Sequence, residues 1–204
     1  MVISEKLREE KENEFEKFIS VKEENTLYVT DFVRCPLKNY YEKIHKELAK
    51  SGVFTPSIIL GDFVHVGLEE FIKNNFANAQ TEVDVEREII VNGRQIKIQG
   101  RIDALAEIDG EKTVIEIKTT RSDKGLPYEH HKAQLQIYMW MTGIKKGLLV
   151  YVTPDSITEY PINEPLDEAV VIRLTEETLK MSKTPRYSWE CKYCVFSSIC
   201  PSKK

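Results

Sequence analysis

The chain has 204 residues and 41% of them are apolar, which is enough for one domain with its own core and a small appendage. The formal net charge of −4 excludes a protein that coats nucleic acid by bulk attraction, because phosphate neutralisation needs clustered Lys and Arg. The first residues are too charged for a signal peptide, and no apolar run approaches the ~20 residues that a bilayer requires. We therefore expect a soluble, cytoplasmic protein.

Helical patterns occupy the first part of the chain. Residues 4–24 are dense in charge and carry a thin apolar stripe, which predicts a docking helix or solvated arm. Residues 31–48 predict a second helix capped by Thr30, in which Pro36 is tolerated near the helix start or else introduces a kink. The thin apolar stripe of the helix predicted over residues 4–24 consists of Leu7, Phe15, Phe18 and Ile19.

A third helix is predicted over residues 56–79, since apolar residues recur there at helical spacing. We expect much of its apolar surface to come from Ile59, Phe63, Val66, Phe71 and Ile72.

The centre of the chain changes to alternating strand patterns over residues 83–91, 94–108 and 111–120. The three strands are separated by Asn92-Gly93 and Asp109-Gly110. Both dipeptides favour two-residue type I′ turns, because both central residues of such a turn need positive φ. The pattern predicts three antiparallel strands.

The rest of the chain predicts a helix over 128–141, a strand over 147–153 and a helix over 164–181. We divide the sequence into an N-terminal extension (1–27), a core domain (28–183) and a cysteine-rich tail (184–204). The fold class is mixed α/β, with a central mixed sheet that contains antiparallel hairpins and is flanked by helices.

The register of the second hairpin brings two acids together. If Asp109-Gly110 is a two-residue loop, Ile108 pairs with Glu111, and Asp103 lies opposite Glu116. Facing carboxylates repel by about 3 kcal/mol at an effective dielectric of about 20, so the pair needs a cation or a shared proton. Lys118 shares the face of Glu116 because side chains alternate along a strand.

Such a face is an oxygen-rich site for Mg²⁺ or Mn²⁺, where Lys118 would orient water or neutralise charge on a phosphodiester. The alternative is an ordinary exposed strand face, since Glu-Ile-Lys is a common composition. In that same strand, Ile117 points away from the polar face. The preceding strand has Ile96, Ile98 and Ile102, with Gly100 and Ala104 nearby, as its apolar face.

Two helical pairs could complete the site. His65 follows Gly61 by one turn, and imidazole is a competent Mn²⁺ ligand, although a single His in a helix is more often a packed or exposed residue. Gln134 and Tyr138 are also one turn apart and could contact DNA, or form an ordinary surface pair. Basic residues around Arg121 form a local positive excess that could hold a DNA strand.

Four cysteines, Cys35, Cys191, Cys194 and Cys200, are better explained by a bound metal or cluster than by two disulfides, because a cytosolic setting disfavours disulfides. The last three read C-x2-C-x5-C. Thiolates at C-x2-C suit either zinc or an iron–sulfur cluster, and residue chemistry alone leaves both open. A site formed by all four would clasp the N-terminal part of the domain to the tail.

In chain order, Gly61-x3-His65, Gly100-Arg-Ile-Asp103, Glu116-Ile-Lys118 and Gln134-x3-Tyr138 resemble the motifs of RecB-like nucleases in the PD-(D/E)XK superfamily. With the cysteines, the chain is similar to the CRISPR-associated Cas-four family from about residue 30 to residue 201. One departure is that the Pro-Asp of the superfamily's name appears as Ile102-Asp103.

The resemblance implies a restriction-endonuclease-like core with an iron–sulfur appendage. It implies Mn²⁺ or Mg²⁺ held by His65, Asp103, Glu116 and the carbonyl of Ile117, with Lys118 as the catalytic lysine. Gln134 and Tyr138 would assist DNA positioning. The four cysteines would hold a [4Fe-4S] cluster, with [2Fe-2S] or zinc as alternatives.

The activity implied is 5′ to 3′ exonuclease action on single-stranded DNA, with endonuclease action possible in principle. The biological role implied is trimming of DNA for CRISPR spacer acquisition beside the integrase proteins Cas-one and Cas-two. The alternatives are an accessory subunit that recognises DNA ends and cuts little, and a zinc-stabilised interaction module. A homo-oligomer is compatible with the charged N-terminal helix.

Overall fold

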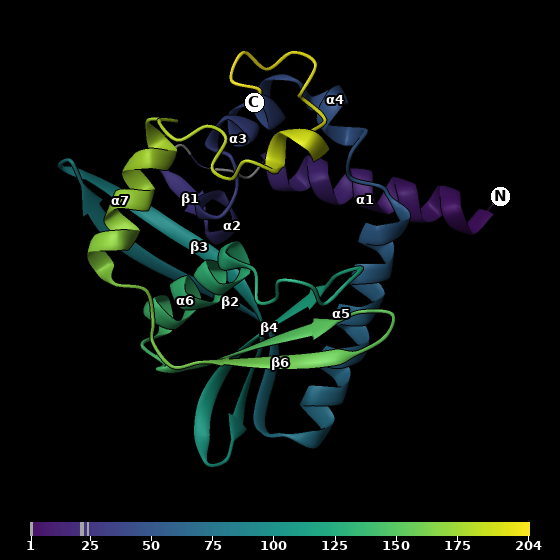
Figure 1. The fold of residues 1–204 in the computed structure, drawn as a ribbon, viewed down its shortest axis with the longest axis vertical. Coiled ribbons are helices and arrows are strands. Elements are labelled where there is room, and N and C mark those ends of the chain that lie inside the picture. The colour runs from purple at the N-terminus through teal and green to yellow at the C-terminus, as the bar shows by residue number, and fades with distance from the viewer. Residues whose placement is uncertain (1, 21–22, 24) are drawn as a thin grey trace.

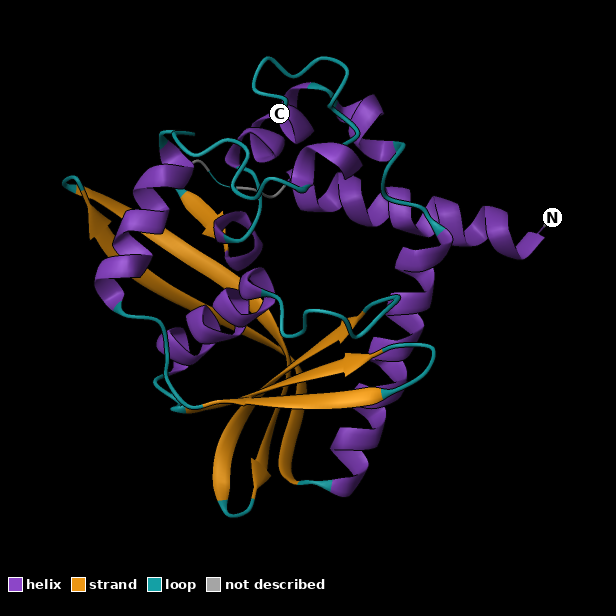
Figure 2. Ribbon diagram, in the orientation of Figure 1, coloured by secondary structure: helices purple, strands orange, loops and turns teal. Residues whose placement is uncertain are grey.

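A computed structural model of the chain describes residues 2–20, 23 and 25–204. A six-stranded mixed sheet with strand order β1-β3-β4-β5-β6, and with β2 on β3, is surrounded by helices (Figures 1 and 2). The helices are α1 (Val2–Ser20), α2 (Val29–Phe32), α3 (Pro36–Ile44), α4 (Lys46–Lys50), α5 (Pro56–Asn75), α6 (Glu129–Thr142) and α7 (Glu168–Leu179), with a 3-10 turn, η1 (Glu190–Tyr193). The strands are β1 (Thr26–Tyr28), β2 (Ala77–Val91), β3 (Arg94–Ile108), β4 (Glu111–Thr119), β5 (Lys146–Val152) and β6 (Ile157–Ile162).

Both predicted hairpins are present. Asn92 and Gly93 have φ of 51° and 74°, and Asp109 and Gly110 have φ of 52° and 79°, as type I′ turns require. Ile108 pairs with Glu111. The expected register of the second hairpin is therefore confirmed from Ile108↔Glu111 to Ala104↔Ile115, and so are the three antiparallel strands. Asp103 and Glu116 lie one step beyond the last pair.

The edge of β3 that faces β4 is divided. β2 pairs with β3 along most of its length, so β1 at residues 97–99 and β4 at residues 104–108 share the other edge. Residues 100–103 lie between these two pairings. Asp103 thus lies in the part of β3 that pairs with neither β1 nor β4.

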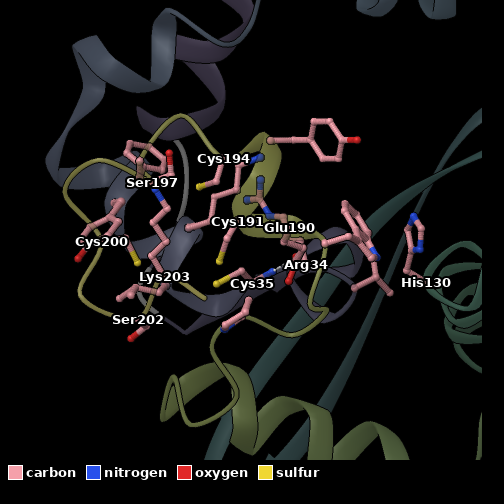
Figure 3. Close-up of a pocket in the computed structure, with 18 residues that line it drawn as sticks. Arg34, Cys35, His130, Glu190, Cys191, Cys194, Ser197, Cys200, Ser202 and Lys203 are labelled. Atoms are coloured by element: carbon pink, nitrogen blue, oxygen red, sulfur yellow. Dashed lines mark hydrogen bonds between the residues drawn. The ribbon is translucent and has the colours of Figure 1, made fainter.

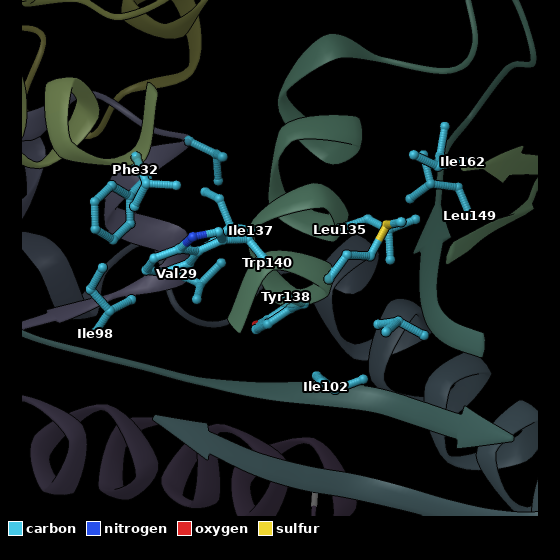
Figure 4. Close-up of a cluster of buried hydrophobic side chains, with 14 of the residues drawn as sticks. Val29, Phe32, Ile98, Ile102, Leu135, Ile137, Tyr138, Trp140, Leu149 and Ile162 are labelled. Carbon is cyan, nitrogen blue, oxygen red and sulfur yellow. The ribbon is translucent and has the colours of Figure 1, made fainter. Parts of the chain in front are cut away.

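Apolar side chains form two cores. One lies between the sheet and helices α2, α6 and α7, and includes Ile98, Ile102 and Leu135, all fully buried (Figure 4). The second lies under α5. The predicted single apolar face of β3 is therefore split, because Ile96, Ile98 and Ile102 join the first core and Ala104 joins the second.

The apolar surface of α5 differs from the prediction. Ile72 is buried, but Phe63, Val66 and Phe71 are 60%, 66% and 56% exposed. The face toward the second core is formed instead by residues on the adjacent side of the helix, namely Val64, Leu68 and Ile72. The helix has apolar residues on two sides, so periodicity alone did not identify the buried one.

The predicted helix over residues 31–48 is wrong as a single element. It is three short helices, and the first begins at Val29, before the proposed cap Thr30. Pro36 is the first residue of α3, where the missing N–H costs nothing, and Cys35 precedes it as the N-cap. The break therefore places Cys35 at a helix start.

Other boundaries moved by a few residues. The N-terminal helix ends at Ser20, and residues 21, 22 and 24 of the predicted range lie outside the described residues. Its apolar stripe is half-buried, with Phe18 against the ring of Tyr28 at 4.7 Å. The third helix ends at Asn75 instead of 79, and β2 begins at Ala77. Strands β1 and β6 have no counterpart in the sequence-based prediction.

In the described part of the chain, no helix combines the length and apolar character that crossing a membrane requires.

Candidate active site

Asp103, Glu116 and Lys118 converge on one wall of a cavity of about 820 Å³. One carboxylate oxygen of Asp103 accepts the backbone N–H of Ile117 at 2.7 Å, taking the place of a strand carbonyl. Lys118 Nζ lies 2.6 Å from Glu116 Oε1. The predicted grouping of the two acids and the lysine is therefore present, while Ile117 is fully buried on the other face.

Glu116 is in an unusual environment for a carboxylate. It is 1% exposed, and among the residues that the structure describes its Oε2 atom has no hydrogen-bond partner. Burial, together with the charge of Asp103, raises the pKa of Glu116 to about 7 against the opposing effect of Lys118. A buried carboxylate oxygen that accepts no hydrogen bond is suited to bind a divalent cation, because Mg²⁺ and Mn²⁺ prefer oxygen ligands.

His65 joins this group from α5. Its Nδ1 lies 3.6 Å from Asp103 Oδ1. Burial lowers the pKa of His65, but the neighbouring Asp103 outweighs burial and the net pKa is raised. His65 therefore lies beside Asp103, and its role as a metal ligand stays a prediction.

Glu69 was missed by the sequence-based prediction. It is 9% exposed, and its Oε1 lies 3.8 Å from His65 Nδ1. Ligand atoms of His65, Glu69 and Asp103 all lie within 4.8 Å of one another. Burial, followed by the charge of Asp103, raises the pKa of Glu69. The available signal was the four-residue spacing from His65, which places both side chains on one helix face.

Gln134 and Tyr138 line the same cavity from α6, but they are only 8% and 3% exposed. The Tyr138 hydroxyl hydrogen-bonds with Gln134 and with the backbone of Arg101, in the divided edge of β3. A Cβ on Gly100 would lie 2.6 Å from Tyr138 Cε1 and 2.8 Å from Val29 Cγ2. Glycine is needed there so that the tyrosine ring can pack on the strand.

Charged side chains are unevenly distributed around the cavity. Glu82, Asp84 and Glu86 line it from β2, and we call these three residues the acidic wall. Arg121 lies outside this cavity lining, in the exposed bend after β4. A polyanion is therefore repelled along one side of the cavity.

The four cysteines are brought together as predicted. They line one cavity of about 210 Å³, with Cys35 from the start of α3 and the other three from the tail (Figure 3). All four are free thiols and half-buried. Burial raises the pKa of Cys35, although backbone N–H groups of Lys38 and Leu37 hydrogen-bond its sulfur and oppose the shift. Such donors also stabilise a ligating thiolate.

Side chains also connect the two cysteine-bearing segments directly. Glu190 accepts the N–H of Cys35 at 2.6 Å and the N–H of Tyr187 at 2.8 Å. Arg186 donates to the carbonyl of Arg34 at 3.2 Å. Hydrogen bonds between protein groups therefore hold the tail against the start of α3.

Comparison with known proteins places this arrangement in a class. Residues 73–201 match the PD-(D/E)XK nuclease superfamily, which covers both acids, Lys118 and the tail cysteines. The fold resembles that of an alkaline exonuclease from Laribacter hongkongensis, with a TM-score of 0.52 and 14% identity over 86% of this chain and 95% of that one. At that identity the likeness concerns the fold alone. The protein is a nuclease of a superfamily that uses divalent metal ions.

The family is set by closer relatives. The chain is 61% identical over 184 residues to the CRISPR-associated exonuclease Cas4 of Saccharolobus solfataricus (strain P2), covering 90% of this chain and 91% of that protein. The crystal structure of SSO0001 matches with a TM-score of 0.93 and 57% identity, covering 100% of this chain and 98% of that one. The chain belongs to the CRISPR-associated Cas4 exonuclease family, which confirms the resemblance and the fold class.

Proposed function

We propose that this protein is a metal-dependent exonuclease that degrades single-stranded DNA from 5′ to 3′. The observation that carries the proposal is the buried Glu116, whose unpartnered oxygen lies in the same cavity as Asp103 and Lys118. An inert strand face has no reason to keep two acids beside each other at this cost in repulsion. The name of the Saccharolobus relative, an exonuclease, supports the same activity.

We assign the metal ligands to His65, Asp103, Glu116 and the carbonyl of Ile117. A Mn²⁺ or Mg²⁺ ion there would supply Lewis-acid chemistry, lowering the pKa of water and neutralising charge on the phosphodiester. The Ile117 N–H fixes the orientation of Asp103 through the 2.7 Å hydrogen bond. Glu69 acts behind His65, where its carboxylate orients the imidazole.

Lys118 is assigned the role of catalytic lysine. Burial lowers the pKa of Lys118, but Glu116 and Asp103 outweigh it and raise the pKa, so the ammonium stays charged at neutral pH. A fixed positive charge stabilises the extra negative charge of the phosphodiester during attack. Gln134 and Tyr138 assist DNA positioning by holding β3 at Arg101, and Arg121 contacts the DNA backbone.

The four cysteines are proposed to hold a [4Fe-4S] cluster with a structural role. Their convergence on one cavity and the N–H donors at Cys35 support a ligating site. The family resemblance favours this cluster over [2Fe-2S] or zinc. An anaerobically purified sample should be brown, and a colourless sample with one bound zinc would contradict the assignment.

The biological role that we propose is trimming of DNA fragments for CRISPR spacer acquisition, in company with the integrase proteins Cas-one and Cas-two. The second candidate is an accessory subunit that recognises DNA ends and cuts slowly. The acidic wall favours this second role, because it repels DNA from part of the cavity. Rates of cutting with and without the integrase proteins distinguish the two roles.

The activity test uses single- and double-stranded DNA labelled at either the 5′ or the 3′ end, incubated with Mn²⁺, Mg²⁺ or a chelator. The parent protein should release 5′-terminal nucleotides first, from single strands, and only with a divalent ion. Asp103→Ala should slow cleavage by at least about 100-fold, because it removes both a ligand and the acceptor of the Ile117 N–H.

Asp84→Ala is the matched control, because Asp84 is an exposed carboxylate of the acidic wall in the same cavity. It should cleave at the parent rate or faster. Cleavage by Asp103→Ala at the parent rate would remove the proposed site, and release of 3′ nucleotides first would overturn the polarity.

A further inference from the structure

Three aromatic rings stand beside the cysteine cavity on the side of α6. Tyr187 and Trp189 are nearly parallel, with ring centroids 5.9 Å apart and an interplanar angle of 13°. The ring of His130 lies 5.1 Å from Trp189 and 5.6 Å from Tyr187. We call Tyr187, Trp189 and His130 the aromatic shelf.

Trp189 is held by these two neighbours and is still 47% exposed. An exposed tryptophan costs free energy, because its large apolar surface stays in contact with water. A ring that is held by its neighbours and is still partly exposed can accept a second flat ring with little further loss of freedom. Every nucleobase offers such a ring, and stacking is how single-stranded DNA is commonly held without sequence preference.

The shelf is linked to the proposed catalytic lysine by a short series of contacts. The rings of His130 and His131 have centroids 4.1 Å apart, and His131 Nδ1 lies 3.0 Å from the hydroxyl of Tyr151. Tyr151 is the residue of β5 paired with Lys118 of β4. Burial lowers the pKa of His130, and of His131 to about 2, and the charge of Lys118 adds to both shifts.

The distribution of charge favours the approach of DNA from the side of the aromatic shelf. The acidic wall repels phosphates on the β2 side of the active-site cavity. Near the shelf, by contrast, Lys38 and Lys203 line the cavity that Trp189 and His130 also line. His130 belongs to the first turn of α6, where the positive end of the helix dipole lies.

We propose that the aromatic shelf is a stacking site for a base of single-stranded DNA, outside the cavity that holds the catalytic lysine. The proposal rests on the proposed function. Trp189 provides the stacking surface, while Tyr187 and His130 hold its ring. The lysines nearby contact phosphates of the same strand.

The test compares two oligonucleotides of equal length, an oligothymidylate and an abasic strand with the same phosphates. Binding is measured with Ca²⁺ in place of Mn²⁺ to suppress cleavage. Trp189→Ala should weaken oligothymidylate binding by about 5- to 150-fold, the range for one lost base–aromatic stack, and leave abasic binding unchanged. Trp189→Phe should bind both strands within about threefold of the parent, since phenylalanine keeps a stacking face.

Fluorescence gives an independent readout. The chain has two tryptophans, and Trp140 is only 7% exposed, so the Trp140→Phe variant reports on Trp189 alone. Oligothymidylate should quench its emission, and the abasic strand should not. Phe71→Ala is the control, because Phe71 is a 56% exposed aromatic residue on the outer side of α5. It should bind both strands as the parent does.

Equal binding of oligothymidylate by Trp189→Ala and the parent would overturn the stacking site, and so would an equal loss for both strands. Cleavage by the parent with Mn²⁺ is measured in parallel. If the parent cleaves and Trp189→Ala binds oligothymidylate normally, the stacking site is overturned and the proposed function is not. If the parent does not cleave single-stranded DNA, the proposed function fails as well.

Discussion

At the scale of single residues, opposing electrostatic effects act on Glu116. It shares a buried environment with Lys118, 2.6 Å away, and with the charge of Asp103. Desolvation favours its neutral form, the lysine favours its charged form, and desolvation wins. A bound divalent cation would reverse this balance, because it binds only the ionised carboxylate.

This balance gives a pH dependence of stability. The pKa of Glu116 rises from its ordinary value of 4.5 to about 7 in the folded protein. Its contribution to stability is therefore complete below pH 4.5 and is lost as the pH rises through about 7. In chelator, the parent should lose melting temperature between pH 5 and 8 by more than Glu116→Gln does. Mn²⁺ should raise the parent's melting temperature more at pH 8 than at pH 5.

Thermal unfolding of both proteins at several pH values is the measurement. If the melting temperatures of the parent and of Glu116→Gln changed equally with pH across that range, the pKa of Glu116 would not be raised.

At the scale of elements, the divided edge of β3 creates the site. β1 and β4 pair with different parts of the same edge, and side chains reach the backbone near the gap between them. Tyr138 reaches the backbone of Arg101, and Asp103 takes the N–H of Ile117. The tyrosine can approach only because residue 100 is glycine.

Gly100→Ala should therefore lower the free energy of unfolding by about 1–3 kcal/mol, because the new methyl group overlaps Tyr138 and Val29. Denaturant unfolding measures this. Gly67→Ala is the control, since a Cβ at Gly67 in α5 would meet nothing within 4 Å. It should leave stability unchanged or raise it by about 0.5–1 kcal/mol, the helix preference for alanine. Parent-like unfolding of Gly100→Ala would contradict the packing argument.

The sequence predicts those features of the sheet that depend on contacts between residues close in sequence. Two turn dipeptides fix the registers of both hairpins, so the positions of Asp103, Glu116 and Lys118 on the sheet follow from counting residues. Other parts depend on distant contacts. The three-residue strand β1 forms only because it pairs with β3, and its sequence carries no alternation long enough to detect.

The same distinction explains the helices. Phe63 and Val64 are both apolar, and only the position of the sheet decides that Val64 packs and Phe63 is exposed. Glu69 enters the site because α5 lies against β3, and no motif links it to Asp103. The cysteines could be grouped from chemistry, but the joining residues Glu190 and Arg186 could not.

At the scale of the whole molecule, the tail closes the fold onto its own beginning. In Figure 1 the C-terminal segment lies beside α3 and α4, two helices that are far from it in sequence. Glu190 and Arg186 hold the two segments by hydrogen bonds, and the proposed cluster would add a second connection through all four cysteines. The nuclease cavity is separate from the cysteine cavity, which fits a structural role for the cluster.

Cys194→Ala should therefore destabilise the protein by at least about 2 kcal/mol, a fall in melting temperature of roughly 4 to 8 °C. The exposed Ser188→Ala, in the same tail, should melt within about 1 °C of the parent, as surface substitutions usually do. Calorimetry of anaerobically purified proteins checks both. A Cys194→Ala protein that melts with the parent would mean that no cluster connects the segments.

The central claim is that Asp103 and Glu116 together bind a catalytic divalent ion. The direct measurement is a Mn²⁺ titration followed by electron paramagnetic resonance, which detects the free ion. Asp103→Asn and Glu116→Gln should each weaken binding by more than about 100-fold, since losing a ligand costs more than losing its supporting group. Asp84→Asn should bind as the parent does, and unchanged Mn²⁺ affinity in the first two variants would contradict the account.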